Sequence, residues 1–284
     1  MDYIFGGYDQ FETRGLGPRA KPFSAEFELE YETDNRRNWQ LSPEGSWTYY
    51  GDGGNSYSLG LRANVNVGSR LDFFANLEGE WEKGVIAWAS NESLRRSGSD
   101  WLIGESSARP TQLSDDDYRL VADDGTLNTI LSGVDPFSGS DYYVPVFGER
   151  DTRSIDFTFR STVTFTRNLS LQIYNQLFLA RGKYNDFKIL QDRDTLVDFS
   201  SYPKRDEFSF NSFNSNVVLR WEYRPGSTVF LVWSHGRDVE DQINPLAPFG
   251  ASPYDRPIGT QIGDTFDILP NNSVLLKINY TFLY

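Results

Sequence analysis

The side chains that could carry chemistry in this sequence are mostly carboxylates, and many of them occur at every second position. Two runs of this kind extend from Glu26 to Glu32 and from Glu78 to Glu82. Residues two apart on an extended strand point to the same side of a sheet, so each run predicts a row of carboxylates on one surface. Such a row could attract cations, or it could form ion pairs with basic side chains opposite.

Other catalytic candidates are few. The chain has no Cys and one His, which excludes a disulfide framework, a thiolate zinc site and most multi-histidine metal centres. His235 could act as a general base, and Ser234 and Asp238 lie nearby in the sequence. Because adjacent strand residues point to opposite faces, Ser234 cannot pair with His235, and we expect that the protein is not an enzyme.

Clustered loop carboxylates are the metal candidates. Asp115, Asp117 and Asp123 could supply the oxygen ligands that calcium prefers. None of these segments matches a twelve-residue calcium loop, and acidic loops usually face water. We therefore expect no cofactor, with a calcium site as the alternative.

The charge balance narrows the choice of partners and compartments. With 27 basic and 40 acidic side chains the net charge is −13, which argues against a nucleic-acid partner, because such a partner requires a basic face. The sequence has no run of about 18 apolar residues, and residues 2–12 lack the apolar core of a signal peptide. These features predict either an intracellular chain or a mature or truncated piece of an exported one.

The elements that position the carboxylates are predicted to be β-strands, because apolar and polar residues alternate with a period of two over long stretches. Short turns at 68–69, 167–168 and 225–226 join some of them. Tyr118 to Ile130 resembles an extra hairpin outside the main sheet. The predicted strands span about 3–12, 20–33, 37–50, 56–67, 70–82, 150–166, 169–182, 207–223, 228–237 and 272–284.

These strands favour a membrane barrel over a soluble sandwich. They run about 11–17 residues, whereas strands of soluble domains average about 5–6 and a tilted membrane strand needs about 9–11. Long polar links at about 83–149, 183–206 and 238–271 lie opposite the short turns, as in outer-membrane barrels. The apolar faces are bordered by aromatic residues of the kind found at membrane interfaces, namely Tyr31, Trp81, Trp221, Tyr223, Tyr280 and Tyr284.

We therefore predict an all-β fold, an antiparallel transmembrane β-barrel of about ten strands in the outer membrane of a Gram-negative bacterium. It forms a single domain over residues 1–284 and could be the C-terminal part of a larger barrel. The polar faces would line a narrow interior, where we expect the charges to pair, with a cation-favouring constriction as the alternative. The lining candidates are Glu26, Glu28, Glu30, Glu32, Arg62, Asp72, Glu78, Glu80, Glu82, Arg160, Arg220, Glu222 and Lys277.

The last predicted strand carries apolar residues at alternate positions up to a terminal aromatic. Ile278, Tyr280, Phe282 and Tyr284 resemble the C-terminal signal by which outer-membrane proteins are recognised by the barrel assembly machinery. The expected partners are therefore that machinery and outer-membrane lipid.

Two segments carry a family resemblance. Residues 215–237, SNVVLRWEYRPGSTVFLVWSHGR, and residues 274–282, VLLKINYTF, resemble an uncharacterised outer-membrane barrel domain. In its family this domain follows a carbohydrate-binding module of the family-nine type in exported bacterial proteins, so the resemblance implies an outer-membrane location and a link to polysaccharide handling. It brings no catalytic residues, and this sequence contains neither the export signal nor the sugar-binding module.

We expect an anchoring or passage component of a carbohydrate-related system, with glycans as further partners. A narrow cation-favouring channel, an outer-membrane hydrolase and a soluble sandwich-type binding module are the alternatives. Aromatic residues of the longest link could stack on sugar rings, although we favour their packing the link onto the barrel mouth. These candidates are Trp88, Trp101, Tyr142 and Tyr143.

Overall fold

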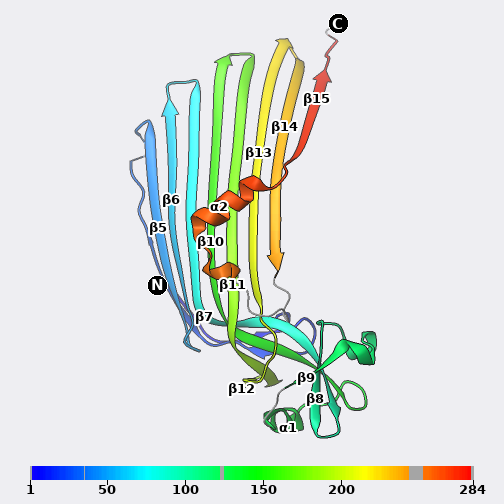
Figure 1. Cartoon of the computed structure of the whole chain (residues 1–284). Coiled ribbons are helices and arrows are strands. Elements are labelled where there is room, and N and C mark those ends of the chain that lie inside the picture. The colour runs from blue at the N-terminus through cyan, green and yellow to red at the C-terminus, as the bar shows by residue number, and fades with distance from the viewer. Residues whose placement is uncertain (1, 35, 122–124, 243–251, 283–284) are drawn as a thin grey trace.

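The fold is built on one large antiparallel sheet. The computed structural model describes residues 2–34, 36–121, 125–242 and 252–282. Along the hydrogen-bonded path the strand order is β1-β4-β5-β6-β7-β10-β11-β13-β14-β15 (Figure 1). The predicted all-β, antiparallel class is therefore confirmed. The path strands are β1 Asp2–Ile4, β4 Ser24–Glu30, β5 Trp39–Tyr50, β6 Asn55–Val67, β7 Leu71–Ser97, β10 Asp141–Thr166, β11 Leu169–Asp192, β13 Glu207–Arg224, β14 Ser227–Gln242 and β15 Asn271–Asn279.

Alternation of apolar and polar residues separates the two faces of this sheet. The register places Leu61, Leu77 and Phe157 side by side, while their neighbours in the sequence point to the other face. The predicted short turns join β6 to β7, β10 to β11 and β13 to β14, all at the end of the sheet drawn uppermost in Figure 1. In the last of these turns Gly226 has φ 75°, which suits the positive-φ position of a type II turn.

Three central strands continue beyond the sheet into a small compact unit, here called the cap. The far ends of β7, β10 and β11 enter it, and β8 Asp100–Gly104, β9 Tyr118–Val121 and β12 Thr195–Asp198 add to it (Figure 1). Helix α1 (Thr126–Ile130) and 3-10 turns at Pro110–Gln112, Asp115–Asp117 and Leu131–Gly133 complete it. Its apolar core consists of Leu94, Trp101, Ile103, Val121, Leu127, Ile130, Leu131, Val144, Val146, Ile189 and Phe199.

Two further segments pack against this frame. Near the N-terminus, β2 Tyr8–Asp9 and β3 Arg19–Ala20 form a separate two-stranded sheet. Near the C-terminus, a 3-10 turn (Pro253–Asp255) leads into helix α2 (Ile258–Asp267), which crosses in front of the sheet in Figure 1. Among the described residues, no helix has both the length and the apolarity needed to cross a membrane.

The sheet is open in this structure. Strand pairing runs from β1 to β15, and in the described part of the chain nothing pairs β15 with β1 or β4. One edge of the sheet is therefore formed by β1 and by the part of β4 that β1 does not cover, and the other edge is formed by β15. The structure gives the antiparallel sheet that was predicted, but not a closed ring of strands.

Several predicted elements differ from those observed. The single strand predicted over 3–12 is wrong, because only two short segments, Asp2–Ile4 and Tyr8–Asp9, form paired strands there. The hairpin predicted over 118–130 is also wrong: Tyr118–Val121 pairs with β8, and Thr126–Ile130 is helical. Strands β7, β10 and β11 are 27, 26 and 24 residues long and far exceed their predicted bounds. Much of the first two predicted links is therefore strand.

Candidate functional site

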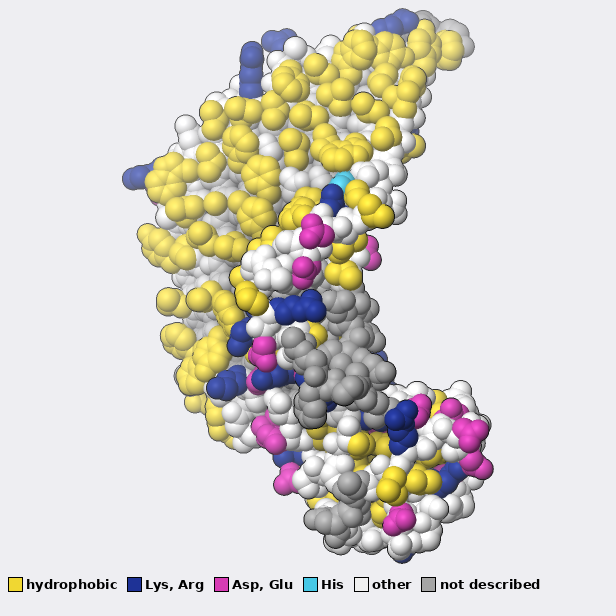
Figure 2. Space-filling view, in the orientation of Figure 1, with side chains coloured by type: hydrophobic (Ala, Val, Ile, Leu, Met, Phe, Trp, Pro, Cys, Tyr) yellow, Lys and Arg dark blue, Asp and Glu magenta, His cyan; other side chains and the backbone are white. Residues whose placement is uncertain are grey.

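One face of the sheet, here called the apolar face, presents large hydrophobic side chains to the surroundings. Leu59 and Leu276 are 64% and 58% exposed although they lie in regular strands. Figure 2 shows this face as an almost continuous hydrophobic surface above and beside α2. Such a surface far exceeds what a soluble monomer usually leaves uncovered. Its residues include Leu29, Leu59, Leu61, Leu77, Phe157, Leu177, Phe213, Val217, Leu231, Trp233, Leu276 and Ile278.

Aromatic residues border the apolar face at both ends. At the far end, Trp221 and Tyr223 lie beside each other, and Arg224 donates a 2.7 Å hydrogen bond to the Tyr280 hydroxyl. At the cap end, the strand register forms one line across six strands, here called the cap-side belt. Its members in order are Phe27, Trp47, Tyr57, Trp81, Arg153 and Arg181.

Helix α2 lies on the apolar face with its polar side inward. Gln261 is buried and donates to the side chains of Ser209 and Asn211, at 3.2 and 2.6 Å. On the same helix Phe266 is 45% exposed. A helix on a soluble protein normally buries its apolar stripe, whereas the buried positions of α2 are the polar Gln261 and Thr265.

The opposite face, here called the polar face, holds the predicted lining residues on β4, β6, β7, β10, β13 and β15. Ion pairs join Arg62 to Glu44 at 3.6 Å and Arg220 to Glu222 at 3.3 Å. A third pair, between Glu82 and Arg150 at 2.6 Å, lies at its cap end. The predicted lining residues that share this face are Glu26, Glu28, Glu30, Arg62, Asp72, Glu78, Glu80, Glu82, Arg160, Arg220, Glu222 and Lys277.

Several carboxylates of the polar face stay without a basic partner. The register brings Glu30, Glu44, Glu78 and Asp156 to one level of the sheet. Within the described ranges only Glu44 of these four forms an ion pair. The remaining predicted residue, Glu32, follows β4 and accepts a hydrogen bond from Gln40. The polar face thus combines paired charges with an excess of negative charge.

The cap contains a buried charged cluster that the sequence analysis did not identify. The Glu92 carboxylate accepts hydrogen bonds from the hydroxyls of Ser90 (2.5 Å) and Tyr202 (2.7 Å) and from the ammonium of Lys204. The Glu92 and Lys204 side chains are only 1% and 5% exposed. These partners are 112 residues apart, so no local sequence signal could have joined them.

This cluster lines a cavity of about 400 Å³ whose wall also includes Glu105, Ser106, Ser107 and Asp206. Burial, with the nearby carboxylates of Glu92 and Glu207, raises the pKa of Asp206 to about 6. Burial likewise raises the pKa of Tyr202 well above its usual value. The cavity therefore offers hydroxyl, ammonium and carboxyl groups for binding a small polar molecule.

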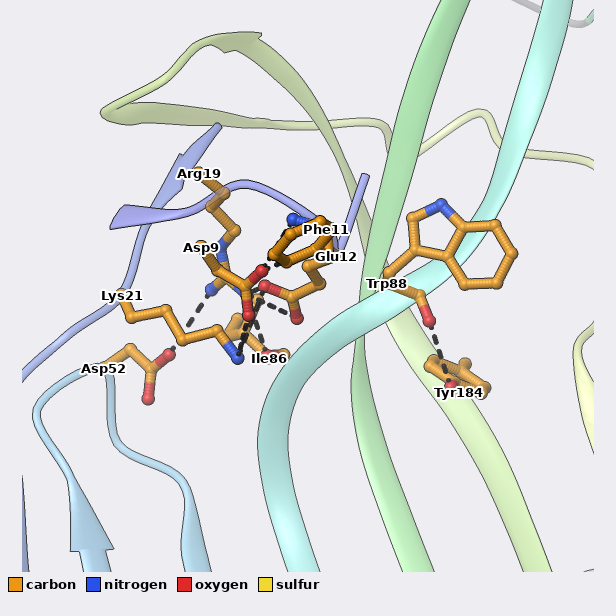
Figure 3. Close-up of polar contacts among 9 residues, drawn as sticks. All are labelled: Asp9, Phe11, Glu12, Arg19, Lys21, Asp52, Ile86, Trp88 and Tyr184. Atoms are coloured by element: carbon orange, nitrogen blue, oxygen red, sulfur yellow. Dashed lines mark hydrogen bonds and ion pairs between the residues drawn. The ribbon is translucent and has the colours of Figure 1, made fainter. Parts of the chain in front are cut away.

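The N-terminal segment is held against the cap end of the sheet by Arg19, which is buried (Figure 3). Its guanidinium donates to the Glu12 carboxylate at 3.2 Å and to the backbone oxygen of Ile86 at 3.1 Å. It also lies 3.8 Å from the Asp52 carboxylate and stacks over the ring of Phe147 at 4.6 Å. These contacts fix residues 8–21 next to β7.

The predicted sugar-stacking residues have unequal exposure. Trp101 is buried in the cap core, where it packs edge-on against Tyr142 at 5.6 Å. Trp88 is partly exposed and lies under the guanidinium of Arg14 at 4.8 Å. Tyr143 is also partly exposed, and its hydroxyl donates to the Ser107 backbone oxygen at 3.0 Å. The contacts of Trp101 and Tyr142 are those of packing residues.

The calcium candidates do not converge. Asp115 pairs with Arg95 at 2.6 Å, Asp117 accepts hydrogen bonds from the Ser114 backbone amide and hydroxyl, and Asp123 lies outside the described residues. In the part of the chain that the structure describes, no group of three or more acidic, His or Cys side chains is arranged to hold a metal ion.

His235 lies on the apolar face, because it is two residues from Trp233 on the same strand. Its Nε2 accepts a 3.0 Å hydrogen bond from Arg237, and its Nδ1 lies 2.9 Å from the side-chain oxygen of Asn272. Ser234 pairs in register with Asn216 and Ser273 on the other face. Both ring nitrogens of His235 are therefore engaged by neighbours other than Ser234.

Of the residues resembling an assembly signal, Ile278 lies on the apolar face in β15. Tyr280 and Phe282 follow this strand with their rings 4.7 Å apart, and both are exposed. Tyr284 lies outside the described residues.

A family model described as a domain of unknown function (DUF5916) matches residues 134–280, which extend from the cap through the last strand. No curated protein matches the chain.

Proposed function

The chain belongs to this family of domains of unknown function, and we propose that it is an outer-membrane β-barrel protein that holds the cap at one surface of the membrane. The observation that carries the proposal is the apolar face, bordered at both ends by aromatic residues. A lipid bilayer offers the apolar surroundings that these exposed side chains require, and aromatic rings favour the two interfaces.

The height of the apolar face agrees with the thickness of a membrane. On β11, the cap-side belt lies at Arg181, and the opposite border lies at Leu169, which pairs with Trp221. These positions are 181 − 169 = 12 residues apart. At about 3.3 Å per residue this is about 40 Å along the strand, or about 30 Å across the membrane for a tilt of about 40°. The hydrocarbon core of a bilayer is also about 30 Å thick.

Closure of the sheet is part of this proposal. Unpaired backbone groups cannot remain in lipid, so the edge formed by β1 and β4 and the edge formed by β15 must pair in the membrane, either with each other or with additional strands. The polar face would then surround the interior, as its charged side chains require.

A second candidate function, a cation-favouring passage, rests on the level of Glu30, Glu44, Glu78 and Asp156 on the polar face. A ring of carboxylates at a constriction favours cations. Single-channel recording tests it: current that favours potassium over chloride is expected, and an absence of current rejects the passage while leaving the barrel intact.

A role in polysaccharide handling rests on the family resemblance, with the cap cavity as a place where a glycan could bind.

The barrel itself is tested by purification and electrophoresis. The folded protein should need detergent to stay monodisperse, and it should migrate differently on a gel before and after boiling, as closed barrels do. As an internal control, vesicle reconstitution should protect the strand region from protease while the cap stays accessible. A monodisperse, detergent-free protein with no heat-dependent shift would overturn the proposal.

A further inference from the structure

Three basic side chains gather on the apolar face around the ring of Tyr254. The Arg153 guanidinium lies 4.6 Å and the Lys183 ammonium 4.8 Å from the ring centroid. Arg181 occupies the position on β11 that pairs directly with Arg153 on β10. Tyr254 and Arg181 are both buried, and Arg181 donates to the backbone oxygen of Arg256. Arg181 is therefore held in place by packing, whereas Arg153 is exposed and Lys183 is partly exposed beside the Tyr254 ring.

This basic cluster, consisting of Arg153, Arg181 and Lys183, keeps an excess of positive charge. Within the described ranges, none of the three forms an ion pair with a carboxylate, and Asp255 is a nearby acid without such a pair. Three neighbouring carboxylates whose side chains the structure describes are engaged elsewhere: Glu207 with Arg205, Asp264 with Arg256, and Asp151 with the Gly84 backbone amide.

The position of the cluster identifies what could neutralise it. Arg153 and Arg181 stand in the cap-side belt, in line with Trp81, Tyr57 and Trp47. Figure 2 shows Lys and Arg side chains gathered beside α2, at the border of the hydrophobic surface. A side chain at this level, on the face directed away from the barrel interior, meets the headgroups of membrane lipids.

We propose that the basic cluster binds the phosphate of an anionic membrane lipid whose acyl chains lie along the apolar face. The inference rests on the proposed function, because only a membrane-embedded sheet brings this face to the headgroups. Guanidinium groups bind phosphate through paired hydrogen bonds, and the exposed apolar side chains of α2 continue the surface on which acyl chains would lie.

The test uses the whole protein in neutral detergent micelles, in which the unfolding midpoint is followed as phosphatidylglycerol is added. We expect the midpoint to rise, because a ligand that binds only the folded state stabilises it. In the double variant R153Q/K183Q, the apparent affinity should fall about thirtyfold, since each basic side chain near an anionic surface contributes about fivefold. Both altered side chains are at least partly exposed, so folding should be retained.

A matched control removes the same charge from the other face. In R62Q/K277Q, which alters the polar face, the affinity for phosphatidylglycerol should stay that of the unaltered protein. Inorganic phosphate at the same concentration should give no rise in the midpoint. An equal loss of affinity for phosphatidylglycerol in both double variants would overturn the lipid site. An equal rise of the unfolding midpoint with inorganic phosphate would overturn it as well.

Vesicle reconstitution separates failure of this inference from failure of the proposed function. If the protein inserts into phosphatidylcholine vesicles but binds phosphatidylglycerol no better than phosphatidylcholine, the lipid site is rejected and the membrane barrel stands. If it inserts into neither vesicle type, both proposals fall.

Discussion

Replacing Lys204 by Met should loosen the cap, because it leaves the buried Glu92 carboxylate without its cation. Removing one partner of a buried ion pair costs about 3–5 kcal/mol. The Ser90 and Tyr202 hydroxyls still donate to the carboxylate, at 2.5 and 2.7 Å, and hydrogen bonds to a charged group retain part of the stabilisation. We therefore expect the low end of this range, about 3 kcal/mol.

Hydrogen exchange of backbone amides measures this change locally. The backbone amides of the buried residues Val144 and Val146 should exchange through opening of the cap. A loss of about 3 kcal/mol should speed that exchange about 100-fold, since about 1.4 kcal/mol corresponds to a factor of ten. The double variant E92Q/K204M, which removes both charges, should recover most of the protection.

Lys188 provides the matched control in the same cap. It pairs with Asp198 at 2.7 Å, but the Asp198 side chain is 79% exposed. An exposed pair contributes about 1 kcal/mol or less, so K188M should speed exchange by less than about fivefold. If K204M and K188M speed hydrogen exchange in the cap equally, the reasoning from the buried pair is refuted. The same holds if the cap of E92Q/K204M exchanges as fast as the cap of K204M.

Three further predictions test the sheet, the cavity and a turn. In a lipid bilayer, Leu177→Arg should lower the free energy of unfolding by about 2–4 kcal/mol, whereas Gln176→Arg on the polar face should change this free energy little. Urea titration in bilayers measures both values, and equal effects of the two variants would contradict the assignment of faces. Because burial raises the pKa of Asp206 to about 6, the folded cap binds this proton more tightly than the unfolded chain, so stability should fall as the pH rises from about 4 through about 6. Asp206→Asn should remove that fall, of about 3 kcal/mol, and an unchanged pH dependence of hydrogen exchange in the cap would contradict the prediction. Gly226→Ala should lower the free energy of unfolding by about 1 kcal/mol, because φ is 75° at this position. The denaturant midpoint should fall accordingly, and an unchanged midpoint would contradict strain in the turn.

The sequence predicts the sheet well where apolar and polar residues alternate regularly. Strands 56–67 and 70–82 match the observed β6 and the first part of β7, because one apolar face requires strict alternation over their whole length. Prediction fails where two-sided burial begins. Val85 and Leu94 belong to one continuous strand, but beyond Gly84, which has φ 63°, the cap covers both faces and the alternation is lost.

The sequence also carries helical spacing in segments that are predicted as a hairpin and as a link. Leu127, Ile130 and Leu131 follow the spacing of a buried helical stripe and lie in the cap core around α1. Ile258 and Phe266 show a similar spacing in α2. The charged cluster of the cap had no such signal, because Glu92 and Lys204 meet only through tertiary packing.

The continuity of β7, β10 and β11 through the cap-side belt has a mechanical consequence. No linker separates the sheet from the cap, and the β7–β10 ladder continues from Val163–Leu71 to Asp141–Arg95. A force applied to the cap along these strands therefore loads many backbone hydrogen bonds in shear at once, instead of opening them one at a time. The cap should therefore move as one body with these strands, so that a torque on the cap also turns the strands of the sheet.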